Sequence, residues 1–148
     1  MIEVQIDASH NKSFEKVLVQ AASTVLQNAS IQADVSIILS GDERLRELNS
    51  QFLGIDSTTD VLSFPSGDID PDTGCLYLGD IIISLPRAEL QAAAGKHPVE
   101  DELTLLVVHG MLHLLGYDHA DPDEKARMWS KQSEILDHLG CRISVPNH

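Results

Sequence analysis

The feature that most constrains this chain is a run of three histidines, His109, His113 and His119, in the segment HGMLHLLGYDH. The first two are four residues apart, which places them about 40° apart on one face of a helix with 3.6 residues per turn. Gly116 can adopt the left-handed conformation that ends a helix, so the chain can turn back and bring His119 towards the other two. Three imidazoles that converge in this way leave a fourth tetrahedral position for water, as in a catalytic rather than a structural zinc site.

A single histidine on an apolar helix face is usually a core residue with a satisfied hydrogen bond. Here the segment 103–108 that precedes the run is almost entirely apolar, which predicts a largely buried helix. Two imidazoles buried there without partners would be costly. We therefore expect one Zn²⁺ per chain, held by His109, His113 and His119.

The spacing of the three histidines is that of the metzincin pattern HExxHxxGxxH, in which the residue after the first histidine is a glutamate that acts as general base. This chain has Gly110 at that position. The ligands are kept while the proton shuttle of the protease is lost, which speaks against a protease of that type. A metallohydrolase of another substrate, such as a peptide or a small amide, stays open as an alternative.

The bulk properties predict one folded domain, residues 1–148. The chain has 148 residues, of which 43% are hydrophobic and 22% charged, as in ordinary globular proteins with a buried core. No apolar run approaches the ~20 residues of a membrane span, and the amino terminus alternates like a strand rather than resembling a secretory signal. We expect no membrane partner.

Charge and cysteine content restrict the surroundings of the protein. A formal net charge of −13 argues against coating of nucleic acid by bulk electrostatics, although a local basic groove or a metal-centred phosphate contact remains compatible with it. Cys75 and Cys141 lie outside any metal-ligand spacing. They predict two reduced thiols in a cytoplasmic protein, with a disulfide in a secreted protein as the weaker alternative.

Periodicity predicts an α+β domain with a single mixed β-sheet, packed helices and the metal-bearing helix in the core. Ser13, a capping box at 40–43 and Asp121 are the expected helix starts, and Pro65 is expected to stop a strand. Asp80 interrupts an apolar central strand, where a buried hydrogen bond is expected. Strands are predicted at 2–6, 34–39, 60–64 and 76–85, helices at 14–26, 41–52, 86–94, 98–115 and 122–139, and a loop at 66–74.

Four segments in this order resemble the YbeY family of metal-dependent endoribonucleases. They are Leu48-Asn49, TDVLSFP at 59–65, GDIIIS at 79–84 and the three-histidine run, and the resemblance extends over roughly residues 34–140. It implies a zincin-like arrangement in which the three histidines hold a single zinc. It also implies action on ribosomal RNA, particularly at the 3′ end of small-subunit rRNA, and a part in ribosome quality control. The expected partners are rRNA and the ribosome or ribosome-associated proteins, and no DNA.

One position departs from the family pattern. Where the family usually reads Leu-Asn-x-x-Tyr/Phe-Arg-Gly, this chain reads LNSQFLG, so Leu53 replaces an arginine expected to face the metal cleft. A guanidinium offers phosphate a permanent charge and a fixed fork of donors, and leucine offers neither. Arg44 and Arg46, about two turns earlier on the same helix, are candidates to replace it. A non-catalytic, zinc-stabilised ribosome-assembly protein stays open as an alternative to an enzyme.

The expected reaction is cleavage of a single-stranded RNA phosphodiester by water whose pKa zinc can lower to about 7, with attack by the 2′-hydroxyl as the alternative. The candidate catalytic residues are His113, Asp118 and Ser63. Asp118 either orients a histidine or accepts a proton, or it only caps the turn. For Asp60 we prefer a structural role at the start of a strand. The remaining histidines are expected on the surface or in loops: His10, His97, His138 and His148.

Overall fold

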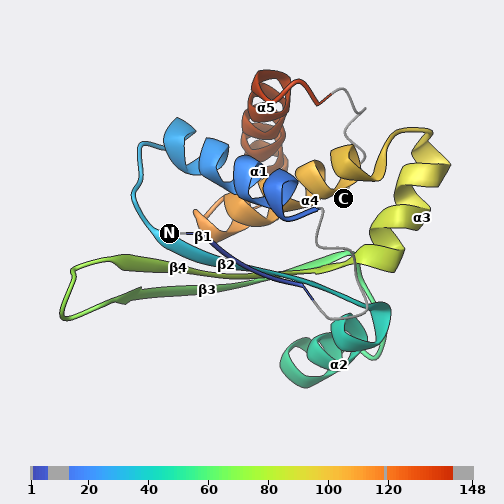
Figure 1. Cartoon of the computed structure of the whole chain (residues 1–148), viewed down its shortest axis with the longest axis horizontal. Helices are drawn as coiled ribbons and strands as arrows, with labels where there is room; N and C mark the ends of the chain where they lie inside the picture. The colour runs from blue at the N-terminus through green and yellow to red at the C-terminus, as the bar shows by residue number, and fades with distance from the viewer. Residues whose placement is uncertain (1, 7–13, 119, 142–148) are drawn as a thin grey trace.

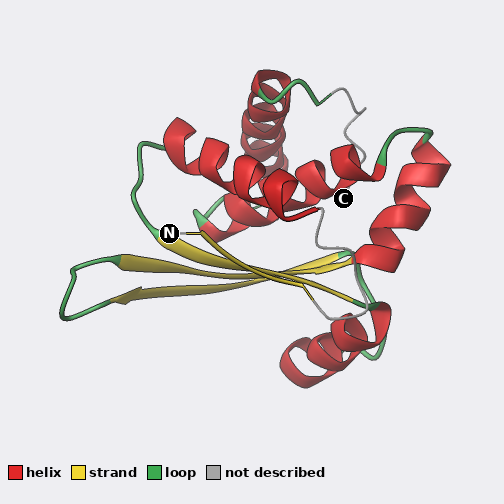
Figure 2. Cartoon of the chain, viewed as in Figure 1, coloured by secondary structure: helices red, strands yellow, loops and turns green. Residues whose placement is uncertain are grey.

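The computed structural model describes residues 2–6, 14–118 and 120–141, which form a mixed four-stranded sheet with helices on both of its faces (Figures 1 and 2). The strand order is β1-β2-β4-β3. The first three of these run parallel and β3 pairs antiparallel with β4, which confirms the predicted mixed α+β fold. The strands are β1 (Ile2–Ile6), β2 (Asp34–Ser40), β3 (Val61–Ile69) and β4 (Leu76–Ser84).

Four helices lie on the upper side of the sheet as it is drawn in Figure 1, and α2 lies below it. No helix of the described residues has the length and apolar character needed to cross a membrane. The helices are α1 (Glu15–Asn28), α2 (Asp42–Leu53), α3 (Leu85–Gly95), α4 (Val99–Leu114) and α5 (Pro122–His138).

Strand alternation separates the two faces of the sheet. On β2, Val35, Ile37 and Leu39 point into the main core on the upper side, where they meet Ile81 and Ile83 of β4. From Glu102 onward, most positions of helix α4 are buried between the sheet and the other helices. A helix that is hydrophobic all round has to be buried, so α4 occupies the core as its sequence predicts.

The lower face has a smaller core. Leu45 of α2 packs against Leu62 and Ile82 of the sheet, and this cluster holds α2 in place. Away from α2 the lower face is polar. The hydroxyl of Tyr77 donates a hydrogen bond to Asp80 there, so Asp80 has the expected hydrogen-bond partner, but the bond is only partly buried.

Two predicted boundaries around β2 and β3 are wrong. Ser40 is the last residue of β2, where it pairs with Ser84, and Gly41 is the N-cap of α2 without any side-chain cap, so there is no capping box. Pro65 does not end β3, which continues to Ile69 through a register irregularity, and the predicted loop shrinks to 70–75. Because β3 is an edge strand, a residue without an N–H can be tolerated in it.

The helix ends follow the sequence in part. Asp121 caps α5 by accepting a hydrogen bond from the Glu124 N–H at 2.8 Å, and Gly116 has the positive φ, 99°, that ends the α4 segment. After α3, however, Lys96 rather than Gly95 takes the left-handed conformation. Ser13 lies outside the described residues, and Phe14 stands at the N-cap of α1.

His97 lies in the loop between α3 and α4, one of the two kinds of place expected for it. His97 is largely buried, and its Nε2 lies 2.7 Å from Oε1 of Glu102, a buried carboxylate in the first turn of α4 that needs such a partner. His138 is exposed as expected, and His10 and His148 lie outside the described residues. Cys75 is exposed and Cys141 is buried, and they form no disulfide with each other, in keeping with the predicted reduced thiols.

Candidate metal centre and adjoining cleft

Helix α4 presents His109 and His113 on one face, as their spacing predicts. Their Nε2 atoms are 3.2 Å apart, and the ring planes are inclined by 80°. The side chain of His109 is 6% exposed and that of His113 is half-buried. His119 lies outside the described residues, and within those residues no three metal-type side chains gather. The structure thus brings together two of the three predicted ligands.

A buried glutamine on α5 fixes the ring of His109. Oε1 of Gln132 lies 2.9 Å from Nδ1 of His109, and Gln132 has no exposed surface. Because an amide oxygen only accepts, Nδ1 carries the proton, and the lone pair of the neutral ring is on Nε2, the atom that faces His113. Sequence reasoning missed Gln132. The available signal was an amide in the buried stripe of α5, with Met128 and Ile135 at helical spacing.

The two imidazoles suit a metal ion. Two nitrogen lone pairs 3.2 Å apart repel each other unless a proton or a cation lies between them. Two imidazoles on one tetrahedral zinc ion, each with a Zn–N bond of about 2.0–2.1 Å, would have nitrogens roughly 3.3 Å apart. Neutral imidazole is also a preferred ligand of zinc and neighbouring transition metals. The described residues therefore fit the expected ion.

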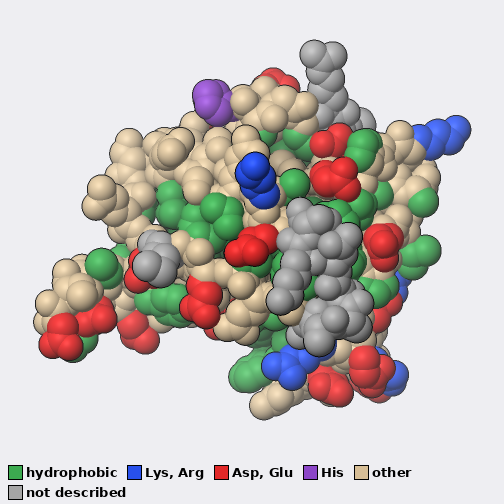
Figure 3. Space-filling view, in the orientation of Figure 1, with side chains coloured by type: hydrophobic (Ala, Val, Ile, Leu, Met, Phe, Trp, Pro, Cys, Tyr) green, Lys and Arg blue, Asp and Glu red, His purple; other side chains and the backbone are tan. Residues whose placement is uncertain are grey.

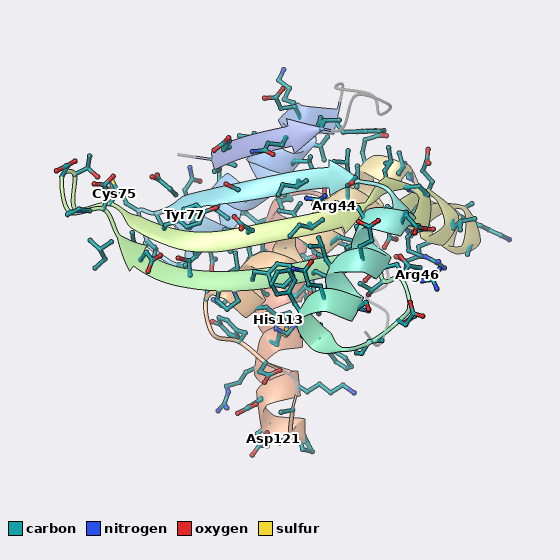
Figure 4. All side chains as sticks on the ribbon, turned by 90° about the horizontal axis from the view of Figure 1, so that it is seen from below. Arg44, Arg46, Cys75, Tyr77, His113 and Asp121 are labelled. Carbon is teal, nitrogen blue, oxygen red and sulfur yellow. The ribbon has the colours of Figure 1, made fainter. Side chains whose placement is uncertain are left out.

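A cleft of about 520 Å³ opens beside the two histidines. Its walls come from the end of α2, the loop that leads into β3, β3 itself and the segment that follows α4. Viewed from below in Figure 4, His113 lies beyond the edge of β3, next to the end of α2 that is farther from the Arg44 label. Besides the two histidines, the lining residues are Leu53, 59–63, Pro65 and 116–118.

The position of Leu53 is as expected, since its side chain lines the cleft. The hypothesis that Arg44 or Arg46 replaces a cleft guanidinium finds no support. Arg46 binds Asp56, with Nε 2.9 Å from Oδ1, which raises the pKa of Arg46 and lowers that of Asp56. Neither arginine belongs to the residues found in the cleft walls.

Ser63 and Asp60 line the cleft but are engaged in holding the backbone. The hydroxyl of Ser63 donates to the Gly110 carbonyl at 3.3 Å, which ties β3 to α4 between the two histidines. Asp60 accepts from the Val61 N–H at 2.8 Å and from the Gln91 amide at 3.3 Å. These contacts support structural roles for both residues.

Gly110, which stands where the metzincin pattern has its glutamate, lies close to the sheet. A Cβ atom there would lie 3.1 Å from both Cγ2 of Ile81 and Oγ of Ser63, closer than ordinary contacts allow. Helix α4 therefore packs directly on the sheet at this residue. A side chain at Gly110 would therefore require the side chains of Ile81 and Ser63 to shift by a few tenths of an ångström.

The loop between α2 and β3 is held by the Leu48-Asn49 segment. Asn49 is buried, and its Nδ2 donates to the Ser57 carbonyl at 2.9 Å, while the hydroxyl of Thr58 donates to the Asp42 carbonyl at 3.1 Å. These bonds fix the segment that carries Thr59 into the cleft. Asp118 is exposed on the opposite wall, and its catalytic role remains a prediction.

The chain has clear relatives. Residues 2–140 match the family model described as Endoribonuclease YbeY. Proteins named Endoribonuclease YbeY from Renibacterium salmoninarum, Shouchella clausii and Brevibacillus brevis are 48%, 42% and 39% identical to it. The alignments cover 71%, 95% and 88% of this chain and 70%, 96% and 89% of those proteins.

The fold is also found in a solved structure. The solution structure of a Thermotoga maritima protein superposes with a TM-score of 0.59 at 26% identity, covering 100% of this chain and 99% of that one. Both kinds of similarity extend over the sheet, the histidine helix and the cleft. The chain therefore belongs to the endoribonuclease YbeY family.

Proposed function

We propose that this protein is a zinc-dependent endoribonuclease that cleaves single-stranded RNA and matures the 3′ end of small-subunit rRNA. One observation carries the proposal: in a member of this family, two imidazole Nε2 atoms meet 3.2 Å apart at the wall of an open cleft. Family membership supports the endoribonuclease activity. The ion is held by His109, His113 and His119. The protein acts in the cytoplasm with the ribosome or its associated proteins, and takes part in ribosome quality control.

The chain's own residues prepare the site for this reaction. Gln132 holds His109 in the tautomer whose lone pair faces the cleft, and Ser63 fixes the backbone of α4 between the two ligands. Asp118 lines the cleft beside the third predicted ligand, and its carboxylate is the proposed proton acceptor. Bound zinc supplies Lewis acidity for a phosphate oxygen and for water.

The alternatives are less well supported. A zinc ion that only stabilised the fold would be enclosed by four protein ligands, whereas a cleft of about 520 Å³ reaches both histidines here. A protease of the zincin type needs a glutamate next to the first ligand. Gly110 stands at that position and packs on the sheet.

Cleavage of RNA by the purified protein tests the proposal. With one equivalent of zinc it should cut a 5′-labelled single-stranded RNA, and a chelator or His113→Ala should abolish the cut. His138→Ala, which removes an exposed histidine far from the cleft, is the matched control and should cleave like the wild type. A 3′-extended small-subunit precursor and a duplex of the same sequence test the choice of substrate. Equal cleavage by wild type and His113→Ala would identify a contaminant and refute the proposal.

A further inference from the structure

The C-terminal end of α2 exposes three apolar side chains next to the cleft. Phe52, Leu53 and Ile55 are 58%, 56% and 50% exposed, and we call them the apolar rim. Leu53 belongs at the same time to the wall of the cleft that contains His113. Figure 3 shows hydrophobic atoms at the surface where α2 lies below the sheet. The rim is therefore continuous with the candidate metal centre.

The rim lies at the C-terminal end of α2, where the helix meets the edge strand of the sheet. Leu45 and Phe52 lie two turns apart on one face of α2, and Leu45 is fully buried under the sheet. The strand that Phe52 meets is β3, the edge strand, so no further strand of the described sheet lies beyond it. The rings of Phe52 and Phe64 meet in a T-shaped arrangement, with centroids 5.3 Å apart and planes inclined by 61°. This contact orients the Phe52 ring and leaves more than half of the side chain open to a ligand.

The charges around the cleft indicate what that ligand is. The cleft walls, as far as the structure describes them, contain no lysine or arginine and include the carboxylates of Asp60 and Asp118. The whole chain carries a formal net charge of −13. An RNA strand therefore gains no attraction from lysine or arginine at these walls beside the proposed ion, which favours contacts without charge. Unpaired bases offer such contacts, because their flat faces stack on aromatic side chains.

We propose that the apolar rim is a nucleobase subsite that receives the unpaired base next to the scissile phosphate. Phe52 stacks on the face of this base, and Leu53 and Ile55 pack against its edge. The inference rests on the proposed function, because it requires an RNA strand in the cleft. It also gives a physical reason for a preference for single strands, since the faces of paired bases are covered by their neighbours.

The test uses zinc-loaded full-length protein and a short single-stranded RNA whose cleavage site has been mapped with the wild type. 2-Aminopurine replaces the base next to that site, so that stacking is measured as quenching of its fluorescence. Phe52→Ala should lose the quenching and raise KM about tenfold with little change in kcat, in keeping with the usual effect of losing one stacked base. Phe52→Trp, which keeps a stacking surface, should retain the quenching and the KM of the wild type. Leu53→Ser should raise KM by a smaller factor than Phe52→Ala does.

The controls separate this inference from the function on which it rests. Leu90 on α3 is 61% exposed and does not line the cleft, so Leu90→Ala should leave quenching and KM unchanged. Wild-type protein that neither binds nor cleaves RNA would refute the proposed function and the subsite together. Wild-type protein that cleaves RNA with a KM and quenching equal to those of a folded Phe52→Ala variant would refute the subsite alone, and would leave the rim to a protein partner.

Discussion

The two sides of the sheet differ in how completely they are packed. On the upper side, α1, α3, α4 and α5 enclose a continuous core that includes the ring of His109 and the amide of Gln132. On the lower side, the apolar contacts of α2 form one small cluster around Leu45, supplemented by polar contacts of Asp42 at the start of the helix. The two histidine ligands thus lie in or beside a densely packed core, where a side chain has few accessible conformations. The apolar rim, by contrast, lies at the end of a helix with few apolar contacts to the sheet. Catalytic geometry and substrate recognition are assigned to different sides.

The largest expected effect compares two buried leucines. Leu106 on α4 and Leu45 on α2 are both fully buried, so replacing either with alanine should lower the free energy of unfolding by about 2–5 kcal/mol. Only Leu106→Ala should also weaken zinc binding, because its cavity forms one helical turn from His109. Urea unfolding and zinc titration measure the two effects. If Leu45→Ala weakened zinc binding as much as Leu106→Ala does, the packing below the sheet would also determine the geometry of the metal ligands above it, which would contradict the separation of the two sides.

The next effect concerns the buried glutamine. Gln132→Leu removes the acceptor that holds Nδ1 of His109 and should reduce zinc affinity about 10- to 100-fold, as is usual for partners of metal ligands. Gln132→Glu keeps an oxygen in that place and should bind zinc at least as well as the wild-type protein does. Competition with a chelating dye measures the affinity. Ser133→Ala, on the exposed side of α5, is the control, and equal affinities of Gln132→Leu and wild type would disprove the role.

A smaller effect is expected on the substrate side. Leu53→Arg places a guanidinium in the cleft wall and should lower KM for RNA several-fold at low salt. One added phosphate contact should make the dependence of log KM on log salt steeper by about 0.7 for a single strand. Leu90→Arg adds the same charge on α3 and should change neither quantity. A Leu53→Arg variant with the KM and salt dependence of the wild type would mean that no phosphate passes this position.

The smallest effect belongs to the polar part of the lower face. Burial and the hydrogen bond to Asp80 raise the pKa of Tyr77. The neutral Tyr77 hydroxyl therefore stabilises the fold fully below about pH 10, the ordinary pKa of tyrosine. This stabilisation is lost as the pH rises through the raised pKa. Tyr77→Phe should lower the free energy of unfolding by about 1 kcal/mol at neutral pH. It should also make the decrease of that free energy with rising alkaline pH less steep. Zinc affinity should not change. Urea unfolding between pH 7 and 11 measures this, and an unchanged alkaline slope would contradict it.

Local spacing made part of the site predictable. The four-residue separation of His109 and His113 fixes their common face on any helix, and the apolar residues before them place that helix in the core. Gln132 is different, because it reaches His109 only through the packing of α5 on α4. Its contact therefore depends on tertiary structure, and the sequence shows only that a buried amide needs a partner.

The errors in the fold have the same origin. Pro65 was expected to end a strand, but β3 lies at the edge of the sheet, and strand order cannot be inferred from the proline itself. Ser40 was expected to cap α2, but its pairing with Ser84 extends β2 by one residue. In each case a long-range contact overrides a correct local preference.

The most direct test is to locate zinc in the loaded protein by anomalous diffraction at the zinc edge, together with X-ray absorption of the same sample. The ion should lie on Nε2 of His109 and His113, with His119 as third nitrogen ligand at about 2.0–2.1 Å and a solvent oxygen in the fourth position, open to the cleft. A zinc ion bound elsewhere, or closed by a fourth protein ligand on these histidines, would contradict the assignment of a catalytic metal centre.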